Sequence, residues 1–237
     1  MWNSLILLFW FIIGAIFGSF ANVLIYRPMA GLKLTEPRFS ICPNCGATIR
    51  WYDNVPILSY LVLRGRCRDC GAKISIRYPI IEITYALSFL LNHAIFPMDL
   101  AIVLDIIFTV SVPAIFIDLR KMLLPDYTWI CTLVASIYAN LYHFSDYWLL
   151  DIIGAVVALT ILLLLKMRYK DGIGAGDLFL LPTFAYACGF VYMPFLLLFS
   201  SLLGIIFGAV KKSKVIPFGP AIISVGYVLV FLRYVLK

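Results

Sequence analysis

Long runs of apolar residues alternate with short polar segments along most of the chain. A membrane-spanning helix needs about 20 mostly apolar residues, and eight runs approach or exceed that length. The runs are continuous and lack the apolar–polar alternation of a β-barrel strand, which favours helices. We therefore predict an all-α polytopic membrane protein with about eight transmembrane helices. The predicted spans are Trp2–Tyr26, Ile80–Phe96, Leu100–Ile117, Tyr127–Tyr142, Tyr147–Leu165, Leu178–Phe190, Phe195–Val210 and Val215–Val235.

The composition supports a membrane protein. The 237 residues are 63% hydrophobic and 13% charged, with a mean hydropathy of +1.01, whereas soluble domains are about 45–50% apolar and about 25% charged. The first run, beginning at Trp2, is too long for the apolar core of a signal peptide and lacks a small-residue cleavage site, so we expect it to remain as a span. Only a turn at Tyr192–Pro194 separates the sixth and seventh runs, and without that break the count is seven.

Basic residues are concentrated in alternate connecting segments. Together these segments contain 17 of the 19 lysines and arginines. Because cytoplasmic loops are enriched in these residues, we predict a membrane protein with its amino terminus outside and these segments in the cytoplasm. The net charge of +7 then reflects topology and contact with membrane lipid, and requires no nucleic-acid partner. The opposite connecting segments carry Asp99 and Asp146.

The first polar segment, 27–79, contains two Cys-x-x-Cys-Gly motifs. Two such turns can present four thiolates tetrahedrally, which predicts a structural zinc site, closed to catalysis because all four ligands are cysteines. A disulfide or redox pair is the alternative, although cytoplasmic disulfides are disfavoured. A segment of this size cannot build a sufficient core alone, so a metal would stabilise it. The predicted ligands are Cys42, Cys45, Cys67 and Cys70.

Two aspartates lie at predicted cytoplasmic ends of spans. Asp118 follows the third run and Asp177 precedes the sixth. Charged groups at such positions are functional candidates, and two neighbouring carboxylates can act as general base and general acid. Glycines at 172, 174 and 176 permit unusual backbone conformations and the close approach of a substrate strand. Each aspartate also has a structural explanation, Asp177 as a helix cap and Asp118 as an interfacial charge.

Five short motifs follow one another along the chain: Gly18-Ser-Phe-Ala-Asn22-Val-Leu-Ile-Tyr-Arg27-Pro28, Asp53-Asn54-Val55-Pro56, Arg77-Tyr78-Pro79-Ile-Ile-Glu82, Asp118 through Pro125, and Gly174-Ala-Gly176-Asp177. In this order, they resemble those of type IV prepilin peptidases. The resemblance covers nearly the whole chain, and the order and topology of the motifs are more specific than any one of them. One departure is Leu178-Phe179-Leu180, since many members have a lysine two places after the aspartate.

The resemblance implies an enzyme of the bacterial inner membrane that removes the basic leader of prepilins or pseudopilins after a glycine at the cytoplasmic face. It also implies Asp118 and Asp177 as the catalytic pair, and Gly172, Gly174 and Gly176 in a flexible active-site loop. It also implies methylation of the new amino terminus with S-adenosylmethionine. We then expect three parts: a first helix (1–26), the zinc loop with the methyltransferase function (27–79) and the peptidase core (80–237).

A carboxylate or amide near the amine would help methyl transfer, because the amine must lose a proton before it attacks. The candidates near the loop borders are Asn22, Arg27, Asp53, Asn54 and Glu82. Structural explanations stay open for them: a turn at Asp53-Asn54, an interfacial anchor at Arg27 and an arginine partner for Glu82.

Two other functions are compatible with the sequence. A related Gly-x-Gly-Asp membrane peptidase would cut another substrate and would not methylate it. A transporter or membrane assembly module would use intramembrane carboxylates to line an ion path. In that case Asp105 and Asp151 would matter as much as Asp118 and Asp177, because a path must cross the bilayer.

Overall fold

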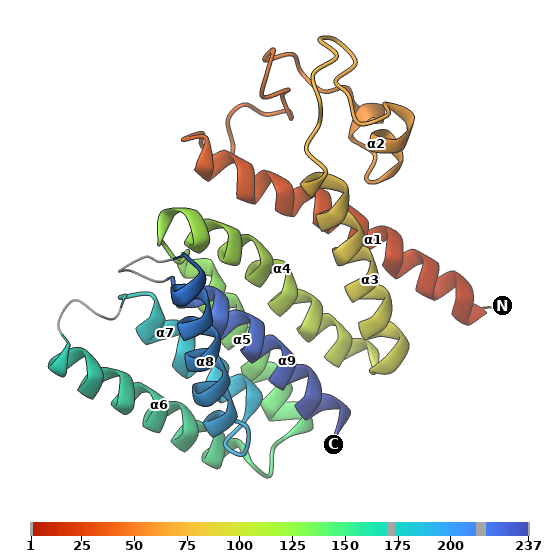
Figure 1. Ribbon diagram of the computed structural model, residues 1–237. Coiled ribbons are helices and arrows are strands. Elements are labelled where there is room, and N and C mark those ends of the chain that lie inside the picture. The colour runs from red at the N-terminus through yellow and green to blue at the C-terminus, as the bar shows by residue number, and fades with distance from the viewer. Residues whose placement is uncertain (1, 170–173, 212–216, 237) are drawn as a thin grey trace. The chain divides into compact units, whose positions relative to one another are not determined.

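The computed structural model describes residues 2–169, 174–211 and 217–236, and every named element in these ranges is a helix (Figure 1). The predicted all-α class is confirmed. Each predicted span coincides with a helix, although residues 215 and 216 of the last lie outside the described ranges. The elements are α1 (Trp2–Met29), η1 (Trp51–Asn54), α2 (Leu58–Val62), α3 (Arg77–Ile95), α4 (Met98–Lys121), α5 (Asp126–His143), α6 (Trp148–Arg168), α7 (Asp177–Cys188), α8 (Met193–Lys211) and α9 (Gly219–Val235).

Among the described residues, three helices are long and apolar enough to cross a membrane. They are α1 over Ser4–Met29, α4 over Met98–Lys121 and α6 over Trp148–Arg168. The predicted number of eight spans is not confirmed. Helix α7 has 12 residues, which is about 18 Å of helix against a hydrocarbon core of about 30 Å. The predicted break before α8 is real, because α7 ends at Cys188 and α8 begins at Met193.

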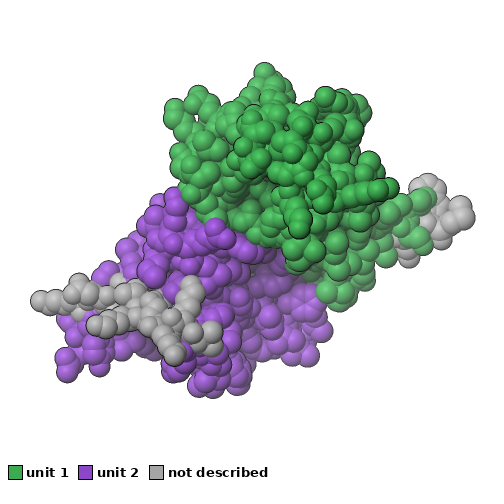
Figure 2. Space-filling model, turned by 45° about the horizontal axis from the view of Figure 1, so that its top comes forward, with its two compact units in different colours: residues 1–101 green, residues 102–237 purple. Residues whose placement is uncertain are grey.

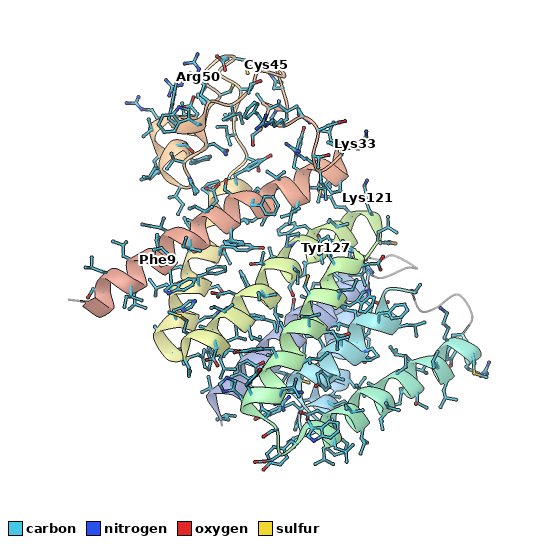
Figure 3. The ribbon with its side chains drawn as sticks, turned by 180° about the vertical axis from the view of Figure 1, so that it is seen from behind. Phe9, Lys33, Cys45, Arg50, Lys121 and Tyr127 are labelled. Carbon is cyan, nitrogen blue, oxygen red and sulfur yellow. The ribbon has the colours of Figure 1, made fainter. Side chains whose placement is uncertain are left out.

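The outer surface is apolar where a soluble protein would be polar. Helix α1 exposes Leu5, Phe9 and Ile12, and α6 exposes Val156 and Leu164 (Phe9 is labelled in Figure 3). Contiguous apolar surface of this extent marks contact with a membrane or with another protein. Together with the three long apolar helices, it identifies a membrane protein.

The chain forms two compact units, Met1–Ala101 and Ile102–Lys237 (Figure 2). In unit 1, α1 packs along α3, and two glycines of α1 allow the backbones to approach closely. A Cβ at Gly14 would lie 2.6 Å from the carbonyl oxygen of Tyr85, and a Cβ at Gly18 would lie 2.7 Å from the Cα of Glu82.

Unit 2 is organised around α7, which contacts α5, α6, α8 and α9. Leu180, Leu181 and Phe184 of α7 are buried. Helix α9 packs so closely that a Cβ at Gly226 would lie 2.3 Å from the ring of Phe184. The short helix is therefore the core of its unit, and its first residue is one of the two predicted catalytic aspartates.

Candidate active site and cysteine cluster

Asp118 and Asp177 lie at the same end of unit 2. Asp118 is in the last turn of α4 and Asp177 is the first residue of α7. Figure 1 shows this end of α4 together with the beginnings of α7 and α9, and Lys121 and Tyr127 mark it in Figure 3. The two side chains are 5% and 8% exposed, and the charge of Asp118 acts on Asp177. The structure thus brings the two predicted carboxylates together within one unit.

Leu124 fills the space beside the aspartates, where it packs against Gly176 and Gly219. A Cβ at Gly219 would lie 2.7 Å from Oδ2 of Asp118 and 2.7 Å from Cδ2 of Leu124. A Cβ at Gly176 would lie 2.8 Å from the Cβ of Leu124. Leu124 therefore lies between the beginnings of α7 and α9, and the absence of a side chain at both glycines allows this packing.

Both carboxylates lie beside the beginning of a helix. Asp177 opens α7, and Asp118 approaches Gly219, which opens α9. The beginning of a helix acts as about half a positive charge, so it stabilises a carboxylate. The backbone N–H of Gly174 also donates to the Asp177 carboxylate. Oδ1 of Asp177 is buried and has no hydrogen-bond partner among the described residues, so it can still accept a hydrogen bond from water or substrate.

The predicted reason for the glycines changes at one position. Gly176 has φ −63° and ψ −35°, an ordinary helical conformation that any residue adopts. The space it leaves is occupied by Leu124, and the approach of a substrate strand stays a prediction. Gly174 contacts Asp177, and Gly172 lies outside the described residues.

Sequence reasoning missed Gly219 and Leu124. Gly219 precedes Pro220, and proline in the first turn indicates only that a helix begins there. The proximity of Gly219 to Asp118 depends on tertiary packing between α4 and α9, which also brings Phe108 and Tyr227 together at 5.2 Å between ring centroids. No local pattern in the chain contains this information.

The four predicted cysteines form one cluster in the loop of unit 1, where Figure 3 labels Cys45. Their sulfur atoms all lie within 4.8 Å of one another, and the four cysteines form no disulfide. Such a set of thiols fits a tetrahedral metal site with Zn–S distances of about 2.3 Å. The cluster could therefore bind a metal ion.

The two Cys-x-x-Cys-Gly turns have the same backbone hydrogen bonds. Gly46 donates to Cys42 at 2.9 Å, and Gly71 donates to Cys67 at 3.0 Å. Both glycines have φ near +70°, which other residues rarely adopt. In the second turn, the backbone N–H of Ala72 and the Asn44 amide lower the pKa of the Cys70 thiol to about 7. This favours the thiolate, which is the form that binds metals.

Two of the methylation candidates, Asn22 and Glu82, lie where α1 contacts α3. The Asn22 amide donates to the carbonyls of Gly18 at 3.3 Å and Tyr78 at 3.2 Å. Its Oδ1 atom is buried without a hydrogen-bond partner among the described residues. Glu82 accepts the backbone N–H of Ile57 at 2.7 Å, so a backbone group takes the place of the arginine considered as its partner.

Arg27 ties the loop to the end of α1. It is buried and donates to the carbonyls of Leu34, Pro37 and Phe39. An interfacial anchor would place this guanidinium among lipid headgroups. Here it satisfies backbone groups of the chain that follows α1.

Asp53 and Asn54 lie in the short helix η1, so the predicted turn is present. Two nitrogens of Arg68 donate to the two carboxylate oxygens of Asp53 at 2.6 and 2.8 Å. This pairing lowers the pKa of Asp53. The five methylation candidates therefore fall in three places in unit 1.

Comparison with known proteins gives the family. The model of the bacterial peptidase A24 N-terminal domain matches residues 12–96, and that of the type IV leader peptidase family matches residues 105–209. The first match lies in unit 1 and the second in unit 2. No solved structure matches the chain.

Curated relatives cover most of the chain. A type 4 prepilin-like proteins leader peptide-processing enzyme of Escherichia coli O78:H11 is 32% identical over 93% of this chain and 91% of its own. Prepilin leader peptidase/N-methyltransferases of Legionella pneumophila and Vibrio cholerae are 36% and 34% identical, over 84% and 93% of this chain and 74% and 94% of theirs. The fold and these relatives define a membrane-embedded peptidase. The chain belongs to the type IV leader peptidase family.

Proposed function

We propose that Asp118 and Asp177 are the catalytic pair with which this leader peptidase removes the leaders of prepilins or pseudopilins. The observation that supports this most is that two buried carboxylates, far apart in sequence, interact at one end of unit 2. Leader cleavage is the activity named for the family and its relatives. Acidic side chains without a metal suffice for peptide hydrolysis when one is protonated and the other is not.

The proposed reaction uses one water molecule. One carboxylate accepts a proton from the water as its oxygen attacks the scissile carbonyl carbon. The protonated partner then gives its proton to the departing amide nitrogen, the carbon–nitrogen bond breaks, and a new carboxyl and amine remain. The beginnings of α7 and α9 stabilise the negative charge that the pair must hold.

The proposed topology has α1 and the helices from α3 to α9 in the bacterial inner membrane, the amino terminus outside and the aspartate pair at the cytoplasmic border. It is supported by the distribution of basic residues. A prepilin has an apolar helix after its leader, so it can lie in the bilayer with its scissile bond level with the aspartates. Within this topology we propose a first helix (1–26), a cytoplasmic zinc loop (27–79) and a peptidase core (80–237).

We also propose that the enzyme methylates the new amino terminus with S-adenosylmethionine, and that the cysteine cluster holds a structural zinc ion. The names of the relatives support the first proposal, and the four adjacent thiols support the second. Among the methylation candidates, Asn22 and Glu82 are the most suitable, because each offers a buried oxygen at the contact of α1 with α3.

Cleavage of a prepilin by the purified protein in lipid, with and without S-adenosylmethionine, tests these proposals. Asp118→Asn and Asp177→Asn should abolish leader release while leaving thermal unfolding unchanged. Asp126→Asn is the matched control, because this aspartate begins α5 and accepts the Trp129 indole N–H at 3.3 Å, and it should retain cleavage. Full cleavage by either of the first two variants would contradict the catalytic pair.

The same assay separates the alternative functions. A mature amino terminus of unchanged mass in the presence of S-adenosylmethionine would favour the related peptidase without methylation. An ion path would require Asp105→Asn and Asp151→Asn to abolish function as completely as the Asp118 and Asp177 variants. We expect the folded fraction of each of these two variants to retain cleavage.

A further inference from the structure

The loop of unit 1 has an apolar surface, here called the α2 face. It consists of Trp51 at the start of η1 and Leu58, Leu61 and Val62 of α2. These side chains are 83%, 60%, 65% and 75% exposed, respectively. Leu58, Leu61 and Val62 are spaced i, i+3 and i+4, so they share one side of the helical turn.

The more polar side of α2 points into the loop. Ser59 and Tyr60 are half-buried, and a Cβ at Gly65 would lie 2.9 Å from the Tyr60 hydroxyl. A helical turn in water buries its apolar side and exposes its polar side. The reversed arrangement indicates that the α2 face contacts something apolar.

The position of α2 along α1 and α3 indicates what the α2 face contacts. Ile57, the residue before α2, donates its backbone N–H to Glu82, and Glu82 lies against Gly18 of α1. Gly18 lies about 16 Å from the end of α1 at Met29, at about 1.5 Å per residue. The start of α2 is therefore beside the helix pair, well back from the end of α1 (Figure 1).

This level corresponds to the interior of a leaflet. Helix α1 has 28 residues, about 42 Å of helix, which matches the roughly 40–45 Å of a bilayer with its headgroups. When α1 stands upright, its end lies at the outer edge of the headgroups and Ile57 lies below them. The exposed side chains of the two helices at this level are mostly apolar, among them Phe17, Phe20, Ile80 and Ile83. Thr84 is also exposed, and its hydroxyl donates to the carbonyl of Ile80 at 2.8 Å.

The α2 face could contact either membrane lipid or the substrate, and the charges near the face distinguish these two partners. Arg50 precedes the α2 face, and Arg64 and Arg66 follow it, all three exposed. Arginines beside an apolar face suit a membrane surface with anionic headgroups. They would repel the basic leader that family resemblance implies for the substrate.

We propose that the α2 face docks into the cytoplasmic leaflet of the bilayer, with Arg50, Arg64 and Arg66 on lipid phosphates. Interfacial helices bury their apolar face about 5–10 Å into the boundary between headgroups and acyl chains. The loop is then held to the membrane at a site separate from the helices that cross it. This goes beyond leader cleavage and does not depend on the aspartate pair.

Fluorescence of Trp51 in the full chain tests the proposal. Phenylalanine replaces the other four tryptophans, and the protein is placed in vesicles of phosphatidylglycerol and phosphatidylcholine with bromine near the headgroup end of the acyl chains. The matched control adds Trp51→Phe and Thr48→Trp, since Thr48 is an exposed residue of the cysteine-bearing turns. Matching thermal unfolding curves verify that both proteins fold.

We expect brominated lipid to quench Trp51 and aqueous iodide to leave it largely unaffected, with the reverse for the control tryptophan. Arg64→Gln with Arg66→Gln should reduce the lipid quenching of Trp51 in the anionic vesicles. Quenching of Trp51 by iodide alone, or equal lipid quenching at both positions, would overturn the proposal. The proposal would also be overturned if neither quencher reached Trp51, or if iodide stopped quenching Trp51 only after prepilin was added. In both cases protein would cover the α2 face.

Discussion

The guanidinium of Arg233 in α9 lies 2.6 Å from the carboxylate of Asp151 in α6, and both side chains are buried. The same carboxylate accepts the Asn140 amide at 3.2 Å and the backbone N–H of Phe190 at 3.0 Å. Four segments of unit 2 therefore meet at one ion pair. Asp151, considered above as a member of an ion path, is neutralised by a structural partner.

The ion pair also stabilises the end of α7. Arg233 donates to the carbonyls of Tyr186 at 3.3 Å and Ala187 at 3.0 Å, in the last turn of that helix. A cation at the end of a helix and an anion at its beginning both interact favourably with the helix dipole. Helix α7 has both, with Arg233 at its end and Asp177 at its beginning. The helix that positions a candidate catalytic residue is thus supported at its opposite end.

We predict that Arg233→Met destabilises the protein by about 3–5 kcal/mol, because it leaves the Asp151 charge buried without its partner. Adding Asp151→Leu should restore part of that loss, since apolar side chains can then replace both charges. Thermal unfolding in detergent at a fixed protein concentration measures the effect. If the double variant loses as much stability as the two single variants, Arg233→Met and Asp151→Leu, lose together, the two residues are not coupled and the prediction is wrong.

Apolar runs predicted the helices well because a helix in lipid satisfies its own backbone, so a local pattern suffices. The number of spans was not confirmed, because three helices in the described part of the chain are long and apolar enough to cross a membrane, and α7 is a short helix enclosed by four others. The cysteine cluster was also predictable, since its ligand spacing and glycines are local. The contacts of Gly219 with Asp118 and of Arg233 with Asp151 were not, because each joins residues distant in sequence through packing.

Gly219→Ala should reduce prepilin cleavage about 10- to 100-fold, because its methyl group would displace the Asp118 carboxylate by a fraction of an ångström or more. The backbone of Gly219 is helical, so the change is steric only. Gly154→Ala in α6 is the matched control, since its Cβ would meet Phe190 at 3.4 Å, an ordinary contact. Initial rates on a prepilin measure the effect, and equal rates for the two variants would refute the proposed role of Gly219.

Gly176→Ala should also reduce cleavage, and here the obstacle is the Cβ of Leu124 at 2.8 Å. In a Leu124→Gly background, Gly176→Ala should reduce the cleavage rate much less, because the Cβ of residue 124 is gone. In a Leu124→Ala background, it should reduce the rate about as much as in the natural chain, because that Cβ remains. Rates for the three pairs form double-mutant cycles. An equal loss in all three backgrounds would show that contact with Leu124 is not the cause.

Cys45→Ser should lower the zinc content of the purified chain to well below one ion per molecule, because a four-thiolate site loses a quarter of its ligands. Cys131→Ser is the matched control, since Cys131 lies in α5, apart from the cluster, and it should retain full zinc. Metal analysis by mass spectrometry gives the stoichiometry. Because the aspartate pair lies in unit 2 and the cluster in unit 1, leader release should fall less than amino-terminal methylation. Stoichiometric zinc in Cys45→Ser would argue that this thiol is not a ligand.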